Sequence, residues 1–443
     1  MDFNTRYAKL NDNQRQAVDY IHGSLLVIAG PGTGKTELLS MRTAQILKQT
    51  DTLPNSILCL TFTESGATNM RQRLRQIIGE DAYKIAIHTF HSFGTEIINQ
   101  HREYFFRGAD AQPVDELTQY QIISGILEGL DWRNPLSAKN NGEFVYIKDL
   151  IRIISEFKQS GLTPSELRAI IEDNQSTIAE IAPDIQQVFS AKISKKTIEM
   201  FAPIAEKIAN LAAKNPDEKN SKLPASITPY ANVLALSIVH ATQEAIDENS
   251  TKPLTAWKNK WCEKNANGEF VLKDFTAAEK ISAAIDVYEK YVNILSERSL
   301  FDYDDMILSV IQACESYPEL RANLQEQFQF IMVDEFQDTN LAQLRLLFNL
   351  TSENDDNPNI MAVGDDDQAI FSFQGADVGN IQRFRQHYHD PKIIVLTDNY
   401  RSAENILSSA RDVITQGADR LENTIDGLSK QLTAHANSEG SKV

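Results

Sequence analysis

The chain has 443 residues, of which 42% are apolar and 23% are charged. At roughly 150 residues per domain, this ordinary globular composition predicts about three units with a sizeable core. The formal charge of −18 argues against a protein that coats nucleic acid over its whole surface. A local basic groove could still bind phosphate.

Neither export nor membrane insertion is indicated. No apolar run approaches the ~20 residues that cross a bilayer, and residues 1–4 lack the features of a signal peptide. The three cysteines, Cys59, Cys262 and Cys314, lie far apart and form neither a metal-binding spacing nor a disulfide framework. We therefore expect a protein of the reducing cytoplasm.

Short apolar strands alternate with helical stretches at both ends of the chain. Strands are predicted at residues 25–29, 57–62, 84–88, 330–333, 360–363 and 393–396, and the first helices at about 35–47, 66–78 and 90–100. Because parallel strands need crossovers of about this length, the pattern predicts βαβ units and a parallel sheet.

The middle of the chain is helix-rich and shows no strand series. The economical architecture is an α/β fold in which one parallel-sheet domain is interrupted by a large, mainly helical insertion. The predicted boundaries are 1–107 and 286–416 for the two parts of the sheet domain, 108–285 for the insertion, and 417–443 for a polar connector.

A glycine-rich turn joins the first predicted strand to the first predicted helix. It reads Ala29-Gly30-Pro31-Gly32-Thr33-Gly34-Lys35-Thr36. Backbone N–H groups of such a turn form a nest for anions, and glycines let the chain turn tightly. This context predicts a phosphate-binding loop in which Lys35 reaches the β- and γ-phosphates and Thr36 binds Mg²⁺. A connector without function is the alternative.

The strand at residues 330–333 runs directly into two acids. Asp334 is predicted to hold Mg²⁺, and Glu335 to polarise the attacking water as general base. Solvated acids at a strand end are the alternative interpretation. The prediction requires that Lys35 and both acids meet at adjacent strand tips of one sheet.

Further motifs follow in a specific order and spacing. They are residues 10–18, residues 61–67 with Met70, Arg71 and Arg73, residues 88–93, 334–340, 363–371 and 399–402. With the phosphate loop, they match the glutamine motif and motifs Ia, Ib, II, III and IV of a known family. The chain resembles the superfamily 1 DNA helicases of the UvrD/Rep/PcrA type.

The resemblance implies a RecA-like domain, 1A, with the insertion as 1B. It implies a motor that uses ATP and Mg²⁺ to move along single-stranded DNA, usually 3′ to 5′. Gln14 would read the adenine edge, Tyr400 would pack against the adenine, and Gln368 would sense the γ-phosphate. Arg401 would act as an arginine finger.

The resemblance also implies contacts to DNA. Phe62, Phe371 and Phe373 would stack on bases, whereas Thr61, Thr89, His91 and Ser92 would touch the phosphodiester backbone. Core packing is the alternative for each phenylalanine. The implied partners are single-stranded DNA, its junction with duplex, and repair proteins, with no membrane partner and a location in the cytoplasm at the nucleoid.

The sequence departs from the family pattern at a few positions. Glu37 and Gln374 stand where the family commonly has arginine, and Phe371 and Phe373 replace Tyr and Trp. Nucleotide affinity and the detail of base stacking are therefore in question. We interpret the acidic-aromatic segment 299–306 as a hinge and helix start rather than a ligand site.

Motifs V and VI, which the family carries on a second RecA-like sheet called 2A, are not found. We therefore expect an N-terminal fragment that binds ATP·Mg²⁺ weakly, hydrolyses it very slowly and unwinds nothing alone, since one missing arginine finger costs ~10³–10⁵ in rate. Two alternatives stay open: a module that binds single-stranded DNA or a repair partner without turnover, and the helicase half of a helicase–nuclease.

Overall fold

The chain forms two compact units in a computed structural model. It describes residues 3–105, 111–189, 193–194, 198, 201, 203–207, 210, 230–264, 268, 270–273, 278–351, 357–369, 379–389, 391–417, 420–425 and 427–435. Unit 1 comprises residues 1–113, 158–161 and 301–443, and unit 2 comprises 114–157 and 162–300. The assignment of residues 108–285 to a family insertion domain stays a prediction.

Unit 1 is built on a six-stranded sheet in the order β12-β1-β11-β10-β2-β3. Its strands are β1 (Leu25–Ala29), β2 (Ile57–Thr61), β3 (Ala86–Thr89), β10 (Phe330–Val333), β11 (Ile360–Gly364) and β12 (Lys392–Leu396). Every neighbouring pair is parallel. The predicted α/β class with a RecA-like parallel sheet is confirmed, and the chain crosses from β3 to β10 only after unit 2.

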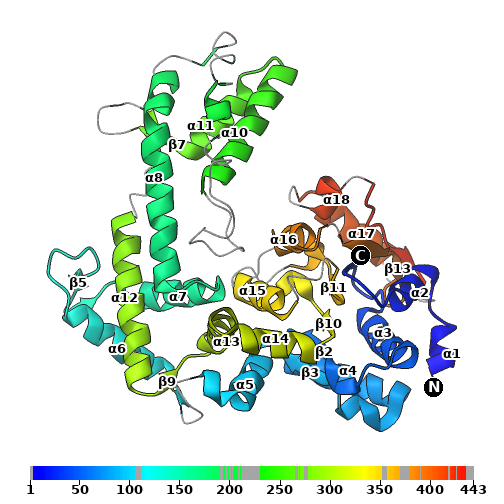
Figure 1. Ribbon diagram of the computed structural model, residues 1–443. Coiled ribbons are helices and arrows are strands. Elements are labelled where there is room, and N and C mark those ends of the chain that lie inside the picture. Colours follow the sequence, from blue (N-terminus) through cyan, green and yellow to red (C-terminus); the bar gives the residue numbers. More distant parts are fainter. Residues whose placement is uncertain are drawn as a thin grey trace. The chain divides into compact units, whose positions relative to one another are not determined.

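Helices cover both faces of this sheet. They are α1 (Phe3–Tyr7), α2 (Asp12–Asp19), α3 (Lys35–Gln49), α4 (Glu64–Ile78), α5 (Phe90–Gln100), α13 (Asp305–Ser316), α14 (Pro318–Gln327), α15 (Leu341–Leu350), α16 (Gly379–His387), α17 (Glu404–Ile414) and α18 (Leu421–Thr424). In Figure 1 the strands β2, β3 and β10 lie between the blue α3 and α4 and the yellow-green α13, α14 and α15.

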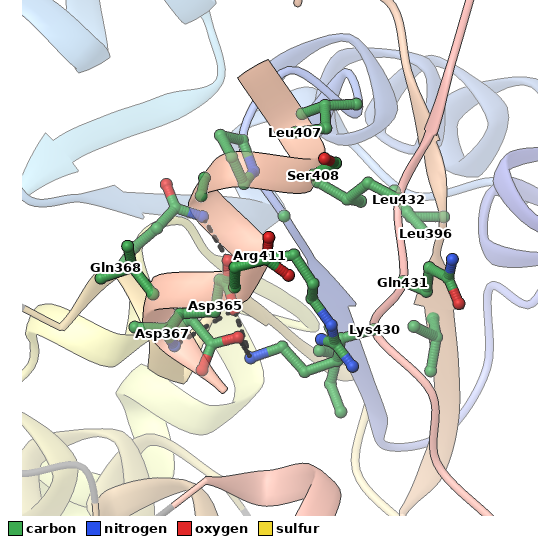
Figure 2. Close-up of a pocket in the computed structure, with 18 of the residues that line it drawn as sticks. Asp365, Asp367, Gln368, Leu396, Leu407, Ser408, Arg411, Lys430, Gln431 and Leu432 are labelled. Atoms are coloured by element: carbon green, nitrogen blue, oxygen red, sulfur yellow. Dashed lines mark hydrogen bonds and ion pairs between the residues drawn. The ribbon is translucent and has the colours of Figure 1, made fainter. Parts of the chain in front are cut away.

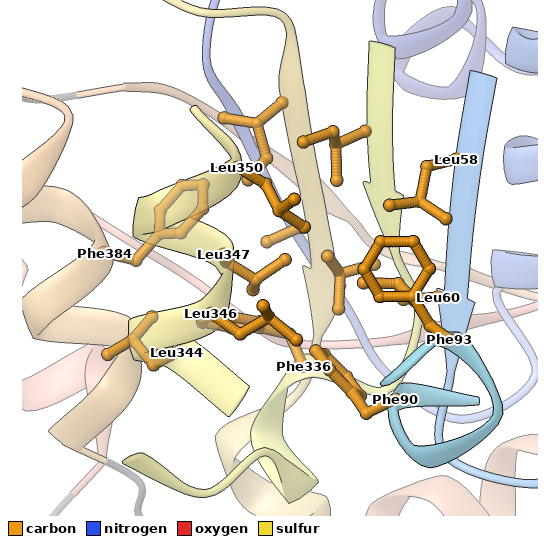
Figure 3. Packing of buried hydrophobic residues seen from close by; sticks show 14 of the residues in the cluster. Leu58, Leu60, Phe90, Phe93, Phe336, Leu344, Leu346, Leu347, Leu350 and Phe384 are labelled. Carbon is orange, nitrogen blue, oxygen red and sulfur yellow. The ribbon is translucent and has the colours of Figure 1, made fainter. Parts of the chain in front are cut away.

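The alternation of side chains along each strand creates two cores. In β1, Leu26 and Ile28 belong to one buried cluster, and Leu25, Val27 and Ala29 to the other. Successive residues of a strand point to opposite faces, so a strand covered on both sides must be apolar throughout. The labelled members of the first cluster in Figure 3 come from β2, α5, α15 and α16 and from the turn after β10.

Unit 2 is mainly helical and has two apolar clusters of its own. Its elements are α6 (Glu116–Glu128), β5 (Lys139–Asn140), β6 (Glu143–Phe144), α8 (Pro164–Phe189), α10 (Tyr230–Asp247), α11 (Lys252–Trp261), β7 (Cys262–Lys264), β8 (Phe270–Leu272) and α12 (Ala278–Glu297), with most of α7 (Ile147–Gln159). Trp257 packs inside one cluster, whereas Trp132 is exposed.

All three cysteines are free and buried, and burial raises the pKa of each thiol to about 12. Among the described residues, no helix is both long enough and apolar enough to cross a bilayer.

Candidate nucleotide and DNA site

The loop between β1 and α3 is compact and leaves no room for side chains at its glycines. Gly32 has a φ of +71° and Gly34 a φ of +86°. A Cβ at Gly32 would lie 2.7 Å from Arg401 Cβ, and one at Gly34 would lie 3.1 Å from Gln14 Nε2. Inside the loop, the buried Thr33 hydroxyl donates to the Gly30 carbonyl at 2.8 Å. The hydrogen bond and the close approach of other side chains to the glycines thus fix the shape of the loop.

The Lys35 ammonium lies over the loop and has two partners. Its Nζ donates to the Ala29 carbonyl at 3.2 Å and to Gln368 Oε1 at 3.4 Å. Gln368 comes from a 3₁₀ turn, η5 (Asp366–Gln368), that follows β11. The lysine and the predicted phosphate sensor are therefore brought together although 333 positions separate them.

Two acids follow β10 at the same carboxyl edge of the sheet. Burial, and then the charge of Glu335, raises the pKa of Asp334 to about 6, against the opposing effects of a backbone hydrogen bond and of Lys35. Glu335 holds a left-handed backbone conformation with a φ of 50°, and its N–H donates to Asp334 Oδ1 at 2.9 Å. A divalent cation binds the ionised carboxylate and would supply further positive charge at this buried site.

The predicted adjacency of the two strand tips is wrong. β11 lies between β1 and β10 in the sheet. The intervening strand contributes Asp365 and Gln368, so the loop and the acids face each other across a third group rather than directly. Even so, the charge of Lys35 acts on Asp334.

Gln14 and Tyr400 lie beside the loop and are tied to it. Gln14 Nε2 donates to the Thr33 carbonyl at 2.9 Å, and its Oε1 accepts from the Asn11 N–H at 3.2 Å. An amide has a second donor and a second acceptor position, which leaves Gln14 able to bind one further group. The exposed Tyr400 ring stacks on His435 at a centroid distance of 5.4 Å.

Arg401 is exposed, and its backbone rather than its guanidinium is anchored. Its N–H donates to Asn399 Oδ1 at 2.8 Å, and Asn399 Nδ2 donates to the Pro31 carbonyl. The Tyr400 N–H donates to the Gly32 carbonyl at 3.0 Å. This segment is therefore bonded to the phosphate loop at two carbonyls.

Glu37, one of the departures from the family pattern, is neutralised by two arginines. Arg6 Nη1 lies 2.8 Å from Glu37 Oε1, and Arg73 Nη1 lies 3.0 Å from Glu37 Oε2. Arg6 comes from α1 and Arg73 from α4. The acid in the first turn of α3 thus brings positive charge from two other helices to this position.

Three of the residues predicted to touch a DNA backbone, Thr61, Thr89 and Ser92, use their hydroxyls in local hydrogen bonds. Thr61 Oγ1 donates to the Thr63 carbonyl at 3.0 Å. Thr89 caps α5 and forms a reciprocal pair with Ser92, and its hydroxyl donates to Glu64 at 3.0 Å. Thr61 and Thr89 are buried. Their hydroxyls serve first to shape the ends of β2 and β3.

His91, a predicted DNA contact, is paired with an aromatic residue, Tyr303, that was not predicted from the sequence as a ligand contact. His91 and Tyr303 stack with ring centroids 3.9 Å apart, and 63% of Tyr303 is exposed. Burial lowers the pKa of His91 to about 4, so the imidazole is neutral at pH 7. The segment of Tyr303 is fixed by buried Lys158, whose Nζ lies 2.5 Å from Asp302 and 2.6 Å from Asp305.

Two predicted DNA contacts, Phe371 and Phe373, lie outside the described residues, as does Gln374. Phe62 is described and is partly buried after β2. The remaining predicted residues converge at the carboxyl edge of the sheet. A cavity of about 600 Å³ adjoins that edge and is lined by Pro31, Asp365, Gln368, Lys430 and Leu432, among others (Figure 2).

Comparison with known proteins identifies a family and relatives of this chain. A family model described as the UvrD/REP helicase N-terminal domain matches residues 10–195 and 179–389. The ATP-dependent DNA helicase PcrA of Staphylococcus epidermidis is 27% identical over 419 residues, which cover 94% of this chain and 41% of that protein.

PcrA of Staphylococcus aureus is 27% identical over 411 residues, which cover 93% of this chain and 40% of that protein. The chain spans about two fifths of the length of these curated relatives. Because the family model matches most of the chain, the chain belongs to the UvrD/REP helicase N-terminal domain family.

Proposed function

We propose that this chain forms the ATP-binding part of a motor that moves along single-stranded DNA, in the 3′ to 5′ direction expected of the family. The observation that carries the proposal is the convergence of Lys35, Gln368 and Asp334 at one edge of the sheet. Family membership and the PcrA relatives support the same assignment.

The residues present suit a nucleoside triphosphate with Mg²⁺. The glycine loop would accept the phosphates, because its backbone turns where no Cβ fits. Thr36 and Asp334 would hold the metal, which supplies neutralisation of phosphate charge. Gln14 and Tyr400 would face the base.

In the reaction proposed, the chain's own groups act by position. Lys35 would exchange its present acceptors, Ala29 and Gln368, for phosphate oxygens. Glu335 would accept a proton from the attacking water, since it follows the buried Asp334 at the mouth of the site. Arg401 would place positive charge on the transferring phosphoryl group.

The decisive experiment compares wild type with Lys35→Ala and Glu335→Gln. We expect Lys35→Ala to abolish binding of a fluorescent ATP analogue without loss of fold. Glu335→Gln should keep binding but remove the slow, DNA-stimulated hydrolysis. Lys84→Ala is the matched control, because Lys84 is exposed before β3 and forms an ion pair with Asp81 at the surface. Equal nucleotide binding by Lys35→Ala and wild type would refute the phosphate loop.

The same measurements distinguish the proposed motor from the alternative function. A module that binds single-stranded DNA without turnover would bind an oligonucleotide, and Glu335→Gln would change nothing. For the 443-residue chain by itself, we expect weak ATP·Mg²⁺ binding, very slow hydrolysis and no strand separation, since ~10³–10⁵ in rate depends on a completed arginine-finger arrangement. Processive unwinding by this polypeptide would contradict that expectation.

A further inference from the structure

A buried lysine far from every motif lies among the three acids that precede Gln368. Lys430 Nζ is 2.6 Å from Asp365 Oδ1, 2.6 Å from Asp366 Oδ1 and 2.8 Å from Asp367 Oδ2. Only 5% of its side chain is exposed. Burial alone would lower the pKa of Lys430, but the carboxylates outweigh burial and raise it. Lys430 is therefore a charged ammonium.

The three acids do not depend on Lys430 equally. Arg420 donates to both carboxylate oxygens of Asp367, from Nε at 2.8 Å and from Nη2 at 2.7 Å. The Leu421 N–H donates to Asp366 at 2.8 Å. Among the described residues, the Asp365 carboxylate contacts Lys430, Gln368 and the backbone N–H of Asp367. Lys430 is thus the cation that compensates the buried Asp365.

Asp365 in turn fixes the amide of Gln368. Gln368 Nε2 donates to Asp365 Oδ2 at 2.6 Å, and Gln368 Oε1 lies 3.4 Å from Lys35 Nζ. A carboxylate only accepts and an ammonium only donates, so these two neighbours permit one orientation of the amide. The dashed contacts in Figure 2 show Asp365 between Gln368 and Lys430.

We propose that Lys430 is a positioning residue of the nucleotide site, acting through Asp365 on Gln368. This inference rests on the proposed function. Lys430 keeps Asp365 in place as an anion, Asp365 holds the Gln368 nitrogen, and one N–H of Gln368 remains for a γ-phosphate oxygen. The segment 420–435, which sequence alone predicts as a connector, then contributes to recognition of the triphosphate.

The first test measures nucleotide selectivity. Lys430→Met should lower affinity for a non-hydrolysable ATP analogue about tenfold relative to ADP, because only the triphosphate needs an oriented Gln368. Lys430→Arg should recover most of the loss. Lys290→Met, an exposed lysine of unit 2, is the matched control. An equal loss for ADP and the triphosphate analogue would overturn the proposal.

A double-variant cycle tests whether the effect passes through Gln368. In a Gln368→Ala background, Lys430→Met should produce no further loss of selectivity. Additive losses would show that Lys430 acts by another route. If Lys430→Met does not fold because the buried Asp365 is left uncompensated, the double variant Lys430→Met, Asp365→Asn removes both charges, and we expect it to show the same loss of selectivity.

A nucleotide-free measurement keeps this inference separate from the proposed function. In a chain labelled with ¹⁵N-glutamine, the side-chain amide signal of Gln368, assigned with Gln368→Ala, should shift in Lys430→Met and return in Lys430→Arg. An unchanged signal would refute the positioning role. Wild type that binds no nucleotide, together with a shifted signal, would instead refute the proposed function alone.

Discussion

At the scale of single residues, the site contains charge that the fold does not fully compensate. Asp338 is buried, and its Oδ1 has no hydrogen-bond partner among the residues described. Burial, and then the charge of Glu335, raises the pKa of Asp338 to about 6. The carboxylate therefore weakens the nucleotide-free fold at neutral pH.

Asp338→Asn should stabilise the nucleotide-free chain at pH 7.5 by about 1 kcal/mol once solvent screening is allowed for. The folded wild type takes up its proton near pH 6, above the ordinary range of an aspartate, so the advantage of Asn should vanish as the pH falls from 6 to 4. Thermal unfolding across this range is the measurement. The exposed Asp81→Asn is the control, and a gain independent of pH would contradict the explanation.

The sequence was enough to predict those residues of the candidate site that belong to a short local motif. The loop around Gly32 and the paired acids after a strand are readable because each needs only its neighbours in the chain. Lys430 could not be predicted, because its role depends on acids about sixty positions earlier and no local pattern marks it. The spacing of Thr89 and Ser92 also indicates a helix cap. From the sequence we predicted only a contact of Thr89 with DNA.

At the scale of elements, the strands were predictable but their order was not. The four inner strands of the sheet, β1, β2, β10 and β11, are buried throughout and are almost wholly apolar, because both faces are covered. The sequence of such a strand does not indicate which other strands pair with it in the sheet. The placement of β11 between β1 and β10 therefore had to come from the structure.

The segment that leads into α13 gives a prediction at this scale. Buried Lys158 anchors the segment, and Tyr303 lies exposed on a neutral His91. Bases of a single strand stack on such rings for ~1–3 kcal/mol each. Tyr303→Ala should therefore weaken oligonucleotide binding by about 1 kcal/mol or more, measured by fluorescence anisotropy at fixed salt.

Tyr83→Ala provides the comparison, since Tyr83 is 55% exposed in the same unit but packs beside Arg75. We expect this control to bind the oligonucleotide as wild type does. If Tyr303→Ala also binds the oligonucleotide as wild type does, residues 299–306 are only the hinge and helix start that the sequence suggested.

At the scale of the whole molecule, each unit has its own apolar clusters. Two clusters cover the sheet of unit 1, and two others hold the helices of unit 2. The residues proposed to bind nucleotide all belong to unit 1. A ligand that binds one folded unit stabilises that unit, by an amount that grows with the logarithm of the free ligand concentration relative to Kd.

Hydrogen exchange should therefore show added protection in β1, α3 and β11 when saturating ATP analogue and Mg²⁺ are present. Amides of α10 and α11 should exchange as before. Lys35→Ala should abolish the change in unit 1. Protection that spreads equally through both units would contradict independent stabilisation.

The short pairing of β13 (Asp398–Asn399) with β14 (Thr433–Ala434) has a mechanical consequence. The His435 N–H donates to the Asn399 carbonyl at 2.7 Å, and the Asn399 side chain donates to Pro31. A pull applied at residue 435 reaches the glycine turn through Asn399 and also through Tyr400, whose ring stacks on His435 and whose N–H donates to the Gly32 carbonyl. If the glycine turn binds polyphosphate as proposed, such a pull would weaken that binding. A bound polyphosphate would in turn make the β13–β14 segment more resistant to the pull.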